Sequence, residues 1–444
     1  MRWMLCGRGE HVGQERKLLP FAILLLILVN GLASADSAKR LRLPNGLRVV
    51  LKPSMSTDVV AIELLLDISA ADEPPDQQGL RNLVQRLLLR GTRAESGDSI
   101  ARRLADVGGV AEATIGLDYV EVYALAPAEG FEVALDVLAE AVQSPAFDPD
   151  EVEKQKAGAA EGALTARDDP FLETYLAFRE SLYQDHPYGA LTLGAPSSLA
   201  RIAREDVIAF HQANYLPNRA AIAICGGVGE ARAMAAVRRA FGDWAPGPPT
   251  PQRYLPPVRL AASDMAARER PVRRAHLMIG FPAPAAGEDG YYALQVIDSI
   301  LGGGTTGMLA GKLRDELGLV YEVSSFYPTL AAESHFAIYA VTDPSQLETV
   351  KAAILELVGA LRDSPVSEAE LSRAKSYLLG SYALSHQRMK DKAYALAWYE
   401  TLGLGVDFDE RYAEAIQAVT PHQVQQAAQT VFQHFVLALV VPEG

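Results

Sequence analysis

GLRNLVQRLLLRGT, residues 79–92, is the stretch that decides the fold of this 444-residue chain. Its leucines recur at helical spacing, so that Leu83 and Leu87, four residues apart, lie on one side of a helix. A glycine stands at each end of the stretch, Gly79 before the apolar residues and Gly91 after them. Taken alone, the stretch predicts an ordinary amphipathic helix that buries its leucine side.

The same stretch resembles the metal-binding helix of the pitrilysin, insulinase and mitochondrial processing peptidase family, which reads roughly G-L-x-H-x-x-E-H-x-x-x-x-G-T. The frame positions shared with that helix are Gly79, Leu80, Gly91 and Thr92. In the family, the two His bind zinc from one helix face, and the Glu is the general base for a zinc-bound water. In this chain the His, Glu and His positions are held by Asn82, Gln85 and Arg86.

These substitutions remove the chemistry that the helix has in the family. Asn82 is a weak oxygen ligand, Gln85 cannot accept and return a proton at neutral pH, and Arg86 is a fixed cation. The third ligand in the family is a Glu roughly 76 residues after the second His, and the count from Arg86 arrives at Gly162. Its neighbour Glu161 points about 100° away on a helix. We therefore expect no zinc site in this chain.

The amino terminus has the pattern of an export signal. Basic residues precede the apolar run LLPFAILLLILV, and Ala33-Ser34-Ala35 fits an A-x-A cleavage site, which predicts a signal peptide over residues 1–35. An uncleaved anchor is the alternative, although the run is short for a membrane span. The signal predicts a periplasmic protein, and Cys225 is then the only cysteine left, so no disulfide forms within the chain. The net charge of −14 argues against a nucleic-acid partner.

Two similar halves follow the signal. Residues 36–245 form the first and residues 272–444 the second, and the proline-rich segment 246–271 is expected to be a linker. Residues 134–164 in the first half and 353–384 in the second share the order helix, Ser-Pro break, long helix. This internal similarity indicates one architecture used twice.

The strand signals favour an α+β fold. Asn45-Gly46, between two apolar runs, predicts a hairpin turn, and further strands are expected over residues 58–68, 119–127 and 276–284. Helices and strands lack a regular βαβ rhythm, so we expect two similar domains, each a largely antiparallel sheet with helices on one face. The resemblance implies the same fold, with the paired domains forming half of a clamshell.

The second half contains a segment that the resemblance makes functional. Arg314, Gly318, Leu319 and Tyr321 match the family pattern L-R-(x)3-G-L-x-Y. In the family, this Arg and Tyr come from the half opposite the zinc and are thought to hold the substrate backbone and stabilise the oxyanion. A guanidinium and a phenol hydroxyl are suitable donors for that work. The alternative is a surface Arg314 paired with Asp315 or Glu316, and a Tyr321 packed beside its strand.

Other polar residues give weaker signals. The eight His show no i, i+4 pair, which argues against a relocated zinc site. Glu112 stands where catalytic family members commonly have Asn. Asp118 and Glu121 flank Tyr119 on a predicted strand, in a region that, by the resemblance, forms an edge for pairing with extended peptides.

Taken together, the sequence predicts the non-catalytic subunit of a heterodimeric zinc metallopeptidase. This chain has no cofactor of its own, and a homologous partner carries the zinc, while Arg314 and Tyr321 assist in trans. Unfolded peptides are the expected substrates, and no catalysis is expected from the chain alone. A purely structural or peptide-binding protein is the alternative, and a standalone peptidase with unusual chemistry is a third reading.

Overall fold

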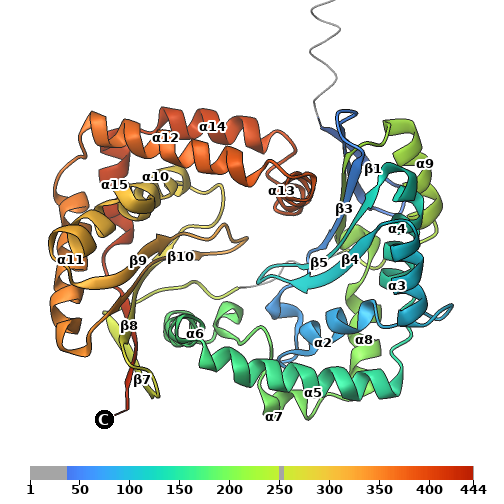
Figure 1. Cartoon of the computed structure of the whole chain (residues 1–444), viewed down its shortest axis with the longest axis horizontal. Coiled ribbons are helices and arrows are strands. Elements are labelled where there is room, and N and C mark those ends of the chain that lie inside the picture. The colour runs from blue at the N-terminus through green and yellow to red at the C-terminus, as the bar shows by residue number, and fades with distance from the viewer. Residues whose placement is uncertain (1–37, 250–254, 444) are drawn as a thin grey trace, which may run out of the picture. The chain divides into compact units, whose positions relative to one another are not determined.

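The computed structural model describes residues 38–249 and 255–443, and the predicted signal at 1–35 lies outside the described residues. Its strands form two mixed sheets, one from each half of the chain (Figure 1). The first has the order β1-β2-β6-β3-β5-β4, with β1 Lys39–Arg42, β2 Arg48–Pro53, β3 Val59–Leu66, β4 Val110–Ile115, β5 Val120–Pro127 and β6 Ala220–Gly226. The second has the order β7-β11-β8-β10-β9, with β7 Asp264–Arg270, β8 Ala275–Ala283, β9 Val320–Phe326, β10 Ser334–Thr342 and β11 Val436–Pro442.

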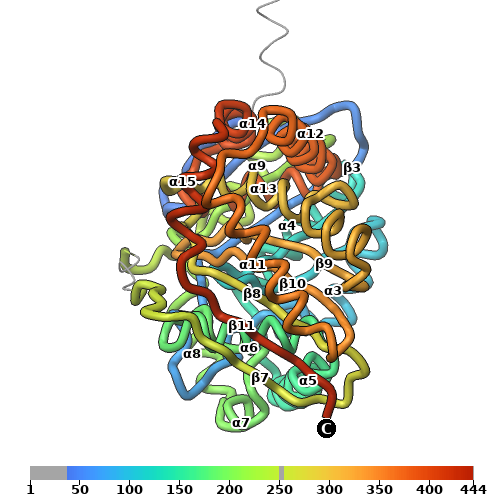
Figure 2. The backbone as a smooth tube through the Cα atoms, turned by 90° about the vertical axis from the view of Figure 1, so that its left-hand side faces the viewer, coloured from blue at the N-terminus to red at the C-terminus, as the bar shows by residue number. Residues whose placement is uncertain are grey.

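Both sheets have the same topology once the short edge strand β1 is set aside. The strands of each half, taken along the chain, lie in the spatial order first, fifth, second, fourth, third. In each sheet the first and fifth strands run parallel, β2 with β6 and β7 with β11, and the other neighbours are antiparallel. Figure 2 shows β7 and β11 side by side. The predicted α+β fold of two similar, largely antiparallel sheets is confirmed.

Helices connect the strands. In the first half they are α2 Leu80–Leu88, α3 Gly97–Asp106, α4 Phe131–Gln143, α5 Pro149–Thr165, α6 Pro170–Tyr183, α7 Pro196–Leu199, α8 Arg204–Asn214 and α9 Glu230–Phe241. In the second half they are α10 Tyr291–Gly302, α11 Leu347–Asp363, α12 Glu368–Ser385, α13 Met389–Thr401, α14 Phe408–Ala418 and α15 Pro421–Val431. Short 3₁₀ turns are η1 Ala70–Asp72, η2 Ala128–Gly130, η3 Ala166–Asp168, η4 Pro187–Gly189, η5 Pro217–Arg219, η6 Gly304–Thr306 and η8 Pro344–Gln346, and η7 Ala310–Glu316 is a π-helix. None of the helices in the described ranges is long and apolar enough to cross a membrane.

The structure corrects the extent of the predicted linker. The sequence assigns residues 246–271 to it, yet Asp264–Arg270 form β7, which pairs with β11 at the edge of the second sheet. The residues of β7 are largely polar and none of them is buried, so this strand lacks the apolar alternation by which a half-buried strand is recognised.

Each sheet is covered on both faces, which the sequence did not predict. In the first sheet, Ile62 and Leu64 pack in the same cluster as α2 and α4 of their own half. Their neighbours Ala61 and Leu65 point to the opposite face, because side chains alternate along a strand. There they share a core with Ala397 of α13, a helix from the second half.

The second sheet receives a helix in return. Phe178 of α6, from the first half, packs in one cluster with Met278 and Ala337 of the second sheet, whereas Leu277 and Phe336 face the helices of their own half. Figure 1 shows α6 and α13 each lying against the sheet of the other half. The two halves therefore exchange one helix each.

Candidate functional site

The glycine frame around α2 has a structural explanation. Gly79 begins the helix with φ 95°, in the left-handed region that favours glycine. A Cβ atom at Gly79 would lie 2.6 Å from Cα of Gly194, so the backbone of the loop before α7 approaches too closely for a side chain. After the helix, Gly91 has φ 145°, and the Thr92 hydroxyl accepts hydrogen bonds from the next turn. The frame fixes α2 in the fold, whatever its chemistry.

Gln85, at the position of the family's general base, has a structural role in this chain. Its side chain is buried, and Nε2 donates to the carbonyl oxygens of Thr114 at 2.8 Å and Glu121 at 2.6 Å. The hydroxyl of Tyr215 donates to Gln85 Oε1 at 2.7 Å. Both ends of the amide therefore hold α2 against β4, β5 and the end of α8. A carboxylate has no hydrogen to donate to the two carbonyl groups.

Asn82 and Arg86, the other two substituted positions on α2, also make hydrogen bonds within the chain. Asn82 is buried and donates from Nδ2 to the Leu193 carbonyl at 3.3 Å. Arg86 is exposed and donates from Nε to Oε1 of Gln155 on α5 at 3.2 Å. A Cβ atom at Gly158, one turn along α5 from Gln155, would lie 3.0 Å from a terminal nitrogen of Arg86.

Gly162, the predicted third ligand position, lies on α5 one turn beyond Gly158 and touches nothing in the direction of a side chain within 4 Å. A long side chain at 162 would lean back over the preceding turn, because helical side chains point toward the helix amino terminus. That direction leads to the Arg86 guanidinium. The structure thus brings α2 and α5 together in the arrangement expected from the sequence, with an arginine where a zinc ligand would stand.

The residues present do not fit a zinc ion. Zinc in proteins takes Cys, His, Asp or Glu ligands, and the four positions offer two amides, a guanidinium and a glycine. Arg86 has only donors, and both ends of the Gln85 amide are occupied by the bonds described above.

Arg314 and Tyr321 lie in the second half, at the edge of its sheet. Arg314 is on the π-helix η7, exposed, and pairs with the carboxylate of Asp315 at 2.8 Å. Tyr321 is 55% exposed on the edge strand β9, and its hydroxyl donates to Oδ2 of Asp343 at 3.0 Å. The guanidinium of Arg274 lies 3.1 Å from the centre of its ring. Both side chains can therefore be reached from solvent, and each has its own partners.

Asp118 joins the two halves. It is buried, accepts a hydrogen bond from the Tyr188 hydroxyl, and accepts another from the backbone N–H of Ala331 at 3.0 Å. Its pKa is raised by burial, against the effect of these two hydrogen bonds. Nearby, His186 orders its turn, since Nδ1 of His186 accepts a hydrogen bond from the backbone N–H of Tyr188.

Sequence reasoning missed two buried charged residues near the site. Arg81 is fully buried on α2 and donates to the carbonyl oxygens of Ile68, Leu117 and Tyr119. Glu63 is fully buried in β3, and neither of its carboxylate oxygens has a hydrogen-bond partner among the described residues. A single charge in an otherwise apolar strand was the available signal for Glu63, whereas Arg81 shares its helix with Arg86 and had no such signal.

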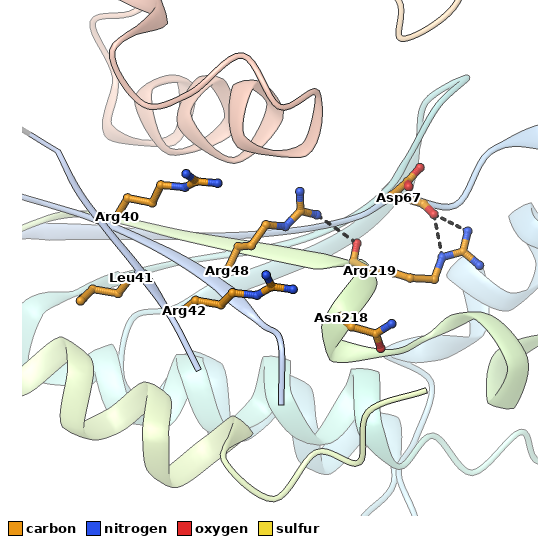
Figure 3. Close-up of a pocket in the computed structure, with 7 residues that line it drawn as sticks. All are labelled: Arg40, Leu41, Arg42, Arg48, Asp67, Asn218 and Arg219. Carbon is orange, nitrogen blue, oxygen red and sulfur yellow. Dashed lines mark hydrogen bonds between the residues drawn. The ribbon is translucent and has the colours of Figure 1, made fainter. Parts of the chain in front are cut away.

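Two cavities flank α13, where the halves meet. One, of about 660 Å³, is lined by the loop before β5, the loop before β10 and the start of α13, including Tyr119, Glu121, Lys390 and Tyr394. The other, of about 570 Å³, is lined mainly by arginines of β1, β2 and η5 (Figure 3). Arg314 and Tyr321 line neither of these two cavities.

Comparison with known proteins finds relatives over most of the chain. Residues 48–194 match the family described as Insulinase (Peptidase family M16), and residues 201–378 match the family described as Peptidase M16 inactive domain. An uncharacterized zinc protease of Bacillus subtilis is 26% identical over 413 residues, which cover 91% of this chain and 98% of that protein. An uncharacterized zinc protease of Rickettsia felis is 24% identical over 402 residues, covering 90% and 96%.

Solved structures show the same fold. A protease from Helicobacter pylori superimposes with a TM-score of 0.84 at 20% identity, covering 92% of this chain and all of that one. A structure titled peptidase M16 inactive domain, from Pseudomonas fluorescens, has a TM-score of 0.85 at 20% identity, covering 92% and 98%.

Proposed function

Since this chain belongs to peptidase family M16, the insulinase family, we propose that it is the non-catalytic subunit of a two-chain zinc metallopeptidase of the periplasm. One observation carries the proposal. Helix α2 keeps the position and frame of the family's metal helix, while its former chemical positions make structural bonds, above all Gln85 with both ends of its amide engaged. The metal and the general base would then come from a homologous partner.

The contribution of this chain would be Arg314 and Tyr321. Their exposure supports the role, because a group that assists a partner's site must be reachable from outside its own chain. Arg314 has five N–H donors in a planar fork, so it can bind a peptide carbonyl beside its pairing with Asp315. The hydroxyl of Tyr321 would turn from Asp343 toward a developing oxyanion.

The edge strand β4 supports peptide binding by this chain. β4 ends the first sheet, and its residues alternate between exposed and half-buried. An extended peptide can add to such an edge through main-chain hydrogen bonds, with alternate side chains directed to the two faces. Unfolded segments fit this mode of binding and folded domains do not.

A purely structural or peptide-binding role is the second candidate, and a specific contact favours it. Arg274 stacks on the ring of Tyr321 and lies 3.8 Å from the Asp343 carboxylate that accepts the Tyr321 hydroxyl. These contacts account for Tyr321 as a surface side chain without any catalytic role.

Reconstitution tests the assistance model. The purified chain is mixed with a zinc-bearing homologue, and cleavage of an unstructured peptide is measured. We expect activity that exceeds that of the homologue alone, and a fall in kcat/KM of about 10²–10³ for Arg314→Ala or Tyr321→Phe, the usual cost of a lost oxyanion donor.

Matched controls are Arg373→Ala and Tyr377→Phe, both exposed residues on α12, which should leave the rate unchanged. Full activity of the homologue alone, or equal rates for the site and control variants, contradicts the assistance model. Peptide binding that persists in those circumstances selects the second candidate.

A further inference from the structure

Three arginines lie on one face of the first two strands. In the β1–β2 hairpin, Arg42 is the direct cross-strand partner of Arg48, and Arg40 is two residues before Arg42, so all three point to the side facing α13. Figure 3 shows their side chains extending in the same direction, toward Arg219. Like charges directly opposite each other in an antiparallel pair are destabilising, so this arrangement requires compensation.

The protein's own groups supply only part of that compensation. Arg40 pairs with the carboxylate of Glu400 on α13 at 2.8 Å, and Arg219 pairs with Asp72 at 2.9 Å. Arg48 donates to backbone carbonyls, those of Glu400 at 2.9 Å and Ala220 at 3.2 Å among them.

Arg42 makes fewer hydrogen bonds and ion pairs than the other three arginines of this cavity. It donates from Nε to the carbonyl of Gly46 at 3.3 Å, and in the described part of the chain it has no ion pair. Its two terminal nitrogens make no hydrogen bond there. Counting Asp67, whose charge acts on Arg48, the four guanidinium groups of this cavity meet three carboxylates, so one positive charge remains in excess.

The pKa of Arg48 is affected by the neighbouring positive charges. Burial lowers the pKa of its guanidinium, and the opposing carboxylates of Glu400 and Asp67 raise it. The positive charges of Arg42 and Arg40 lower this pKa further. An anion placed among the three arginines would relieve this repulsion.

From this geometry we infer that the cavity lined by Arg40, Arg42 and Arg48 binds an oxyanion of the phosphate type carried on a small molecule. The three guanidinium groups come from two neighbouring strands and lie side by side on one face, so together they offer more N–H donors than a carboxylate with two oxygens can use, and a group with three terminal oxygens suits them better. The volume of about 570 Å³ exceeds the needs of a bare ion and falls in the usual range for small-molecule sites. The site is independent of the peptidase role proposed above.

Calorimetry on the purified chain alone tests the site, with inorganic phosphate and pyrophosphate as probes at constant ionic strength set by sodium chloride. We expect saturable binding of one anion per chain, weakened at least tenfold in Arg42→Gln, since a charge-assisted contact is lost. Arg102→Gln is the matched control, because Arg102 is also exposed and also donates from Nε to a carbonyl four residues away, that of Asp98. It should bind as the wild type does.

A second arm separates the two sources of such a group. Binding to phosphatidylglycerol vesicles but not to phosphatidylcholine vesicles, lost in Arg42→Gln, identifies a lipid headgroup, whereas binding of pyrophosphate without vesicle binding identifies a soluble ligand. Either result supports the site. Heats that equal the chloride control in both arms, equal affinity of Arg42→Gln and wild type, or binding of a triglutamate peptide in preference to both phosphate probes overturns the inference. None of these outcomes bears on the reconstitution experiment.

Discussion

At the scale of single residues, the sequence predicted which residues occupy the site positions on α2, but it did not predict their hydrogen-bond partners. The spacing of α2 placed Asn82, Gln85 and Arg86 correctly on one helix, and the pairing of Arg314 with Asp315, weighed as the alternative, is observed. The partners of Gln85 lie in β4, in β5 and at the end of α8. Each of them is at least 29 residues away from Gln85 along the chain. Long-range hydrogen bonds of this kind depend on the packed fold, so no local pattern announces them.

Gln85→Glu tests the structural role of this side chain. The substituted carboxylate would face the Thr114 and Glu121 carbonyl oxygens without a hydrogen to donate, so we expect the free energy of unfolding at pH 7 to fall by about 2–4 kcal/mol. Urea denaturation measures it. Gln433→Glu makes the same change on an exposed glutamine that follows the end of α15, and should stay within about 0.5 kcal/mol of wild type. Equal stability of Gln85→Glu and wild type would show that these hydrogen bonds contribute nothing.

At the scale of elements, apolar patterns in the sequence predicted where the strands lie, but they did not predict which helices pack on the two faces of each sheet. The predicted hairpin turn at Asn45-Gly46 is present, with Gly46 at φ 93°. The structure buries β6 at all seven positions, because helices cover both faces of its sheet, and this cover was not predicted. The apolar residues of a strand do not indicate which helix will pack against them, because apolar contacts are non-directional. β7 escaped notice because an exposed edge strand needs no apolar pattern.

Gly280 in β8 marks the place where α6 crosses the second sheet. A Cβ atom at this position would lie 2.2 Å from the ring of Phe178, so we expect Gly280→Ala to lower the free energy of unfolding by about 1–3 kcal/mol, the usual cost of overpacking. Gly359→Ala is the matched control in α11, where a Cβ atom meets nothing within 4 Å. It should stabilise by about 0.5–1 kcal/mol, since Ala favours a helix. Thermal or urea unfolding of both variants decides, and a stabilising Gly280→Ala would refute this packing.

At the scale of the whole molecule, charge orients the exchanged helix α13. Its beginning carries Lys390, which lies 3.9 Å from Glu121 at one side of the first sheet. Its end carries Glu400, which pairs with Arg40 at the other side. Between them Glu63 faces the helix from β3, fully buried. Burial raises the pKa of Glu63 well above its usual value, and the neighbouring Glu121 raises it further, against the effect of Lys390.

The sign of the resulting pH dependence follows from linkage. A carboxyl group whose pKa is raised in the folded state contributes stability below its unfolded pKa of about 4.5, and this contribution is lost as the pH rises through the folded value. We therefore expect Glu63→Gln to stabilise the chain at pH 8, by about 1–3 kcal/mol, and to have no effect near pH 4. Urea unfolding across this range gives the difference.

The exposed Glu129→Gln serves as the control and should leave stability unchanged at every pH. A difference between Glu63→Gln and wild type that does not vary with pH would mean that Glu63 keeps its charge in the folded protein. The linkage argument would then fail, although the exchange of helices would stand.

The exchange of α6 and α13 also has a consequence for the order in which the protein can be completed. The first sheet closes when β6 has been made, but Ala61 and Leu65 on its second face wait for α13, roughly 160 residues later. At about 5–20 residues per second, that delay is on the order of ten to thirty seconds of translation. Throughout it, a finished sheet presents a bare apolar surface. The nascent chain is thus most prone to aggregation, and most dependent on a chaperone, when about half of it has been translated.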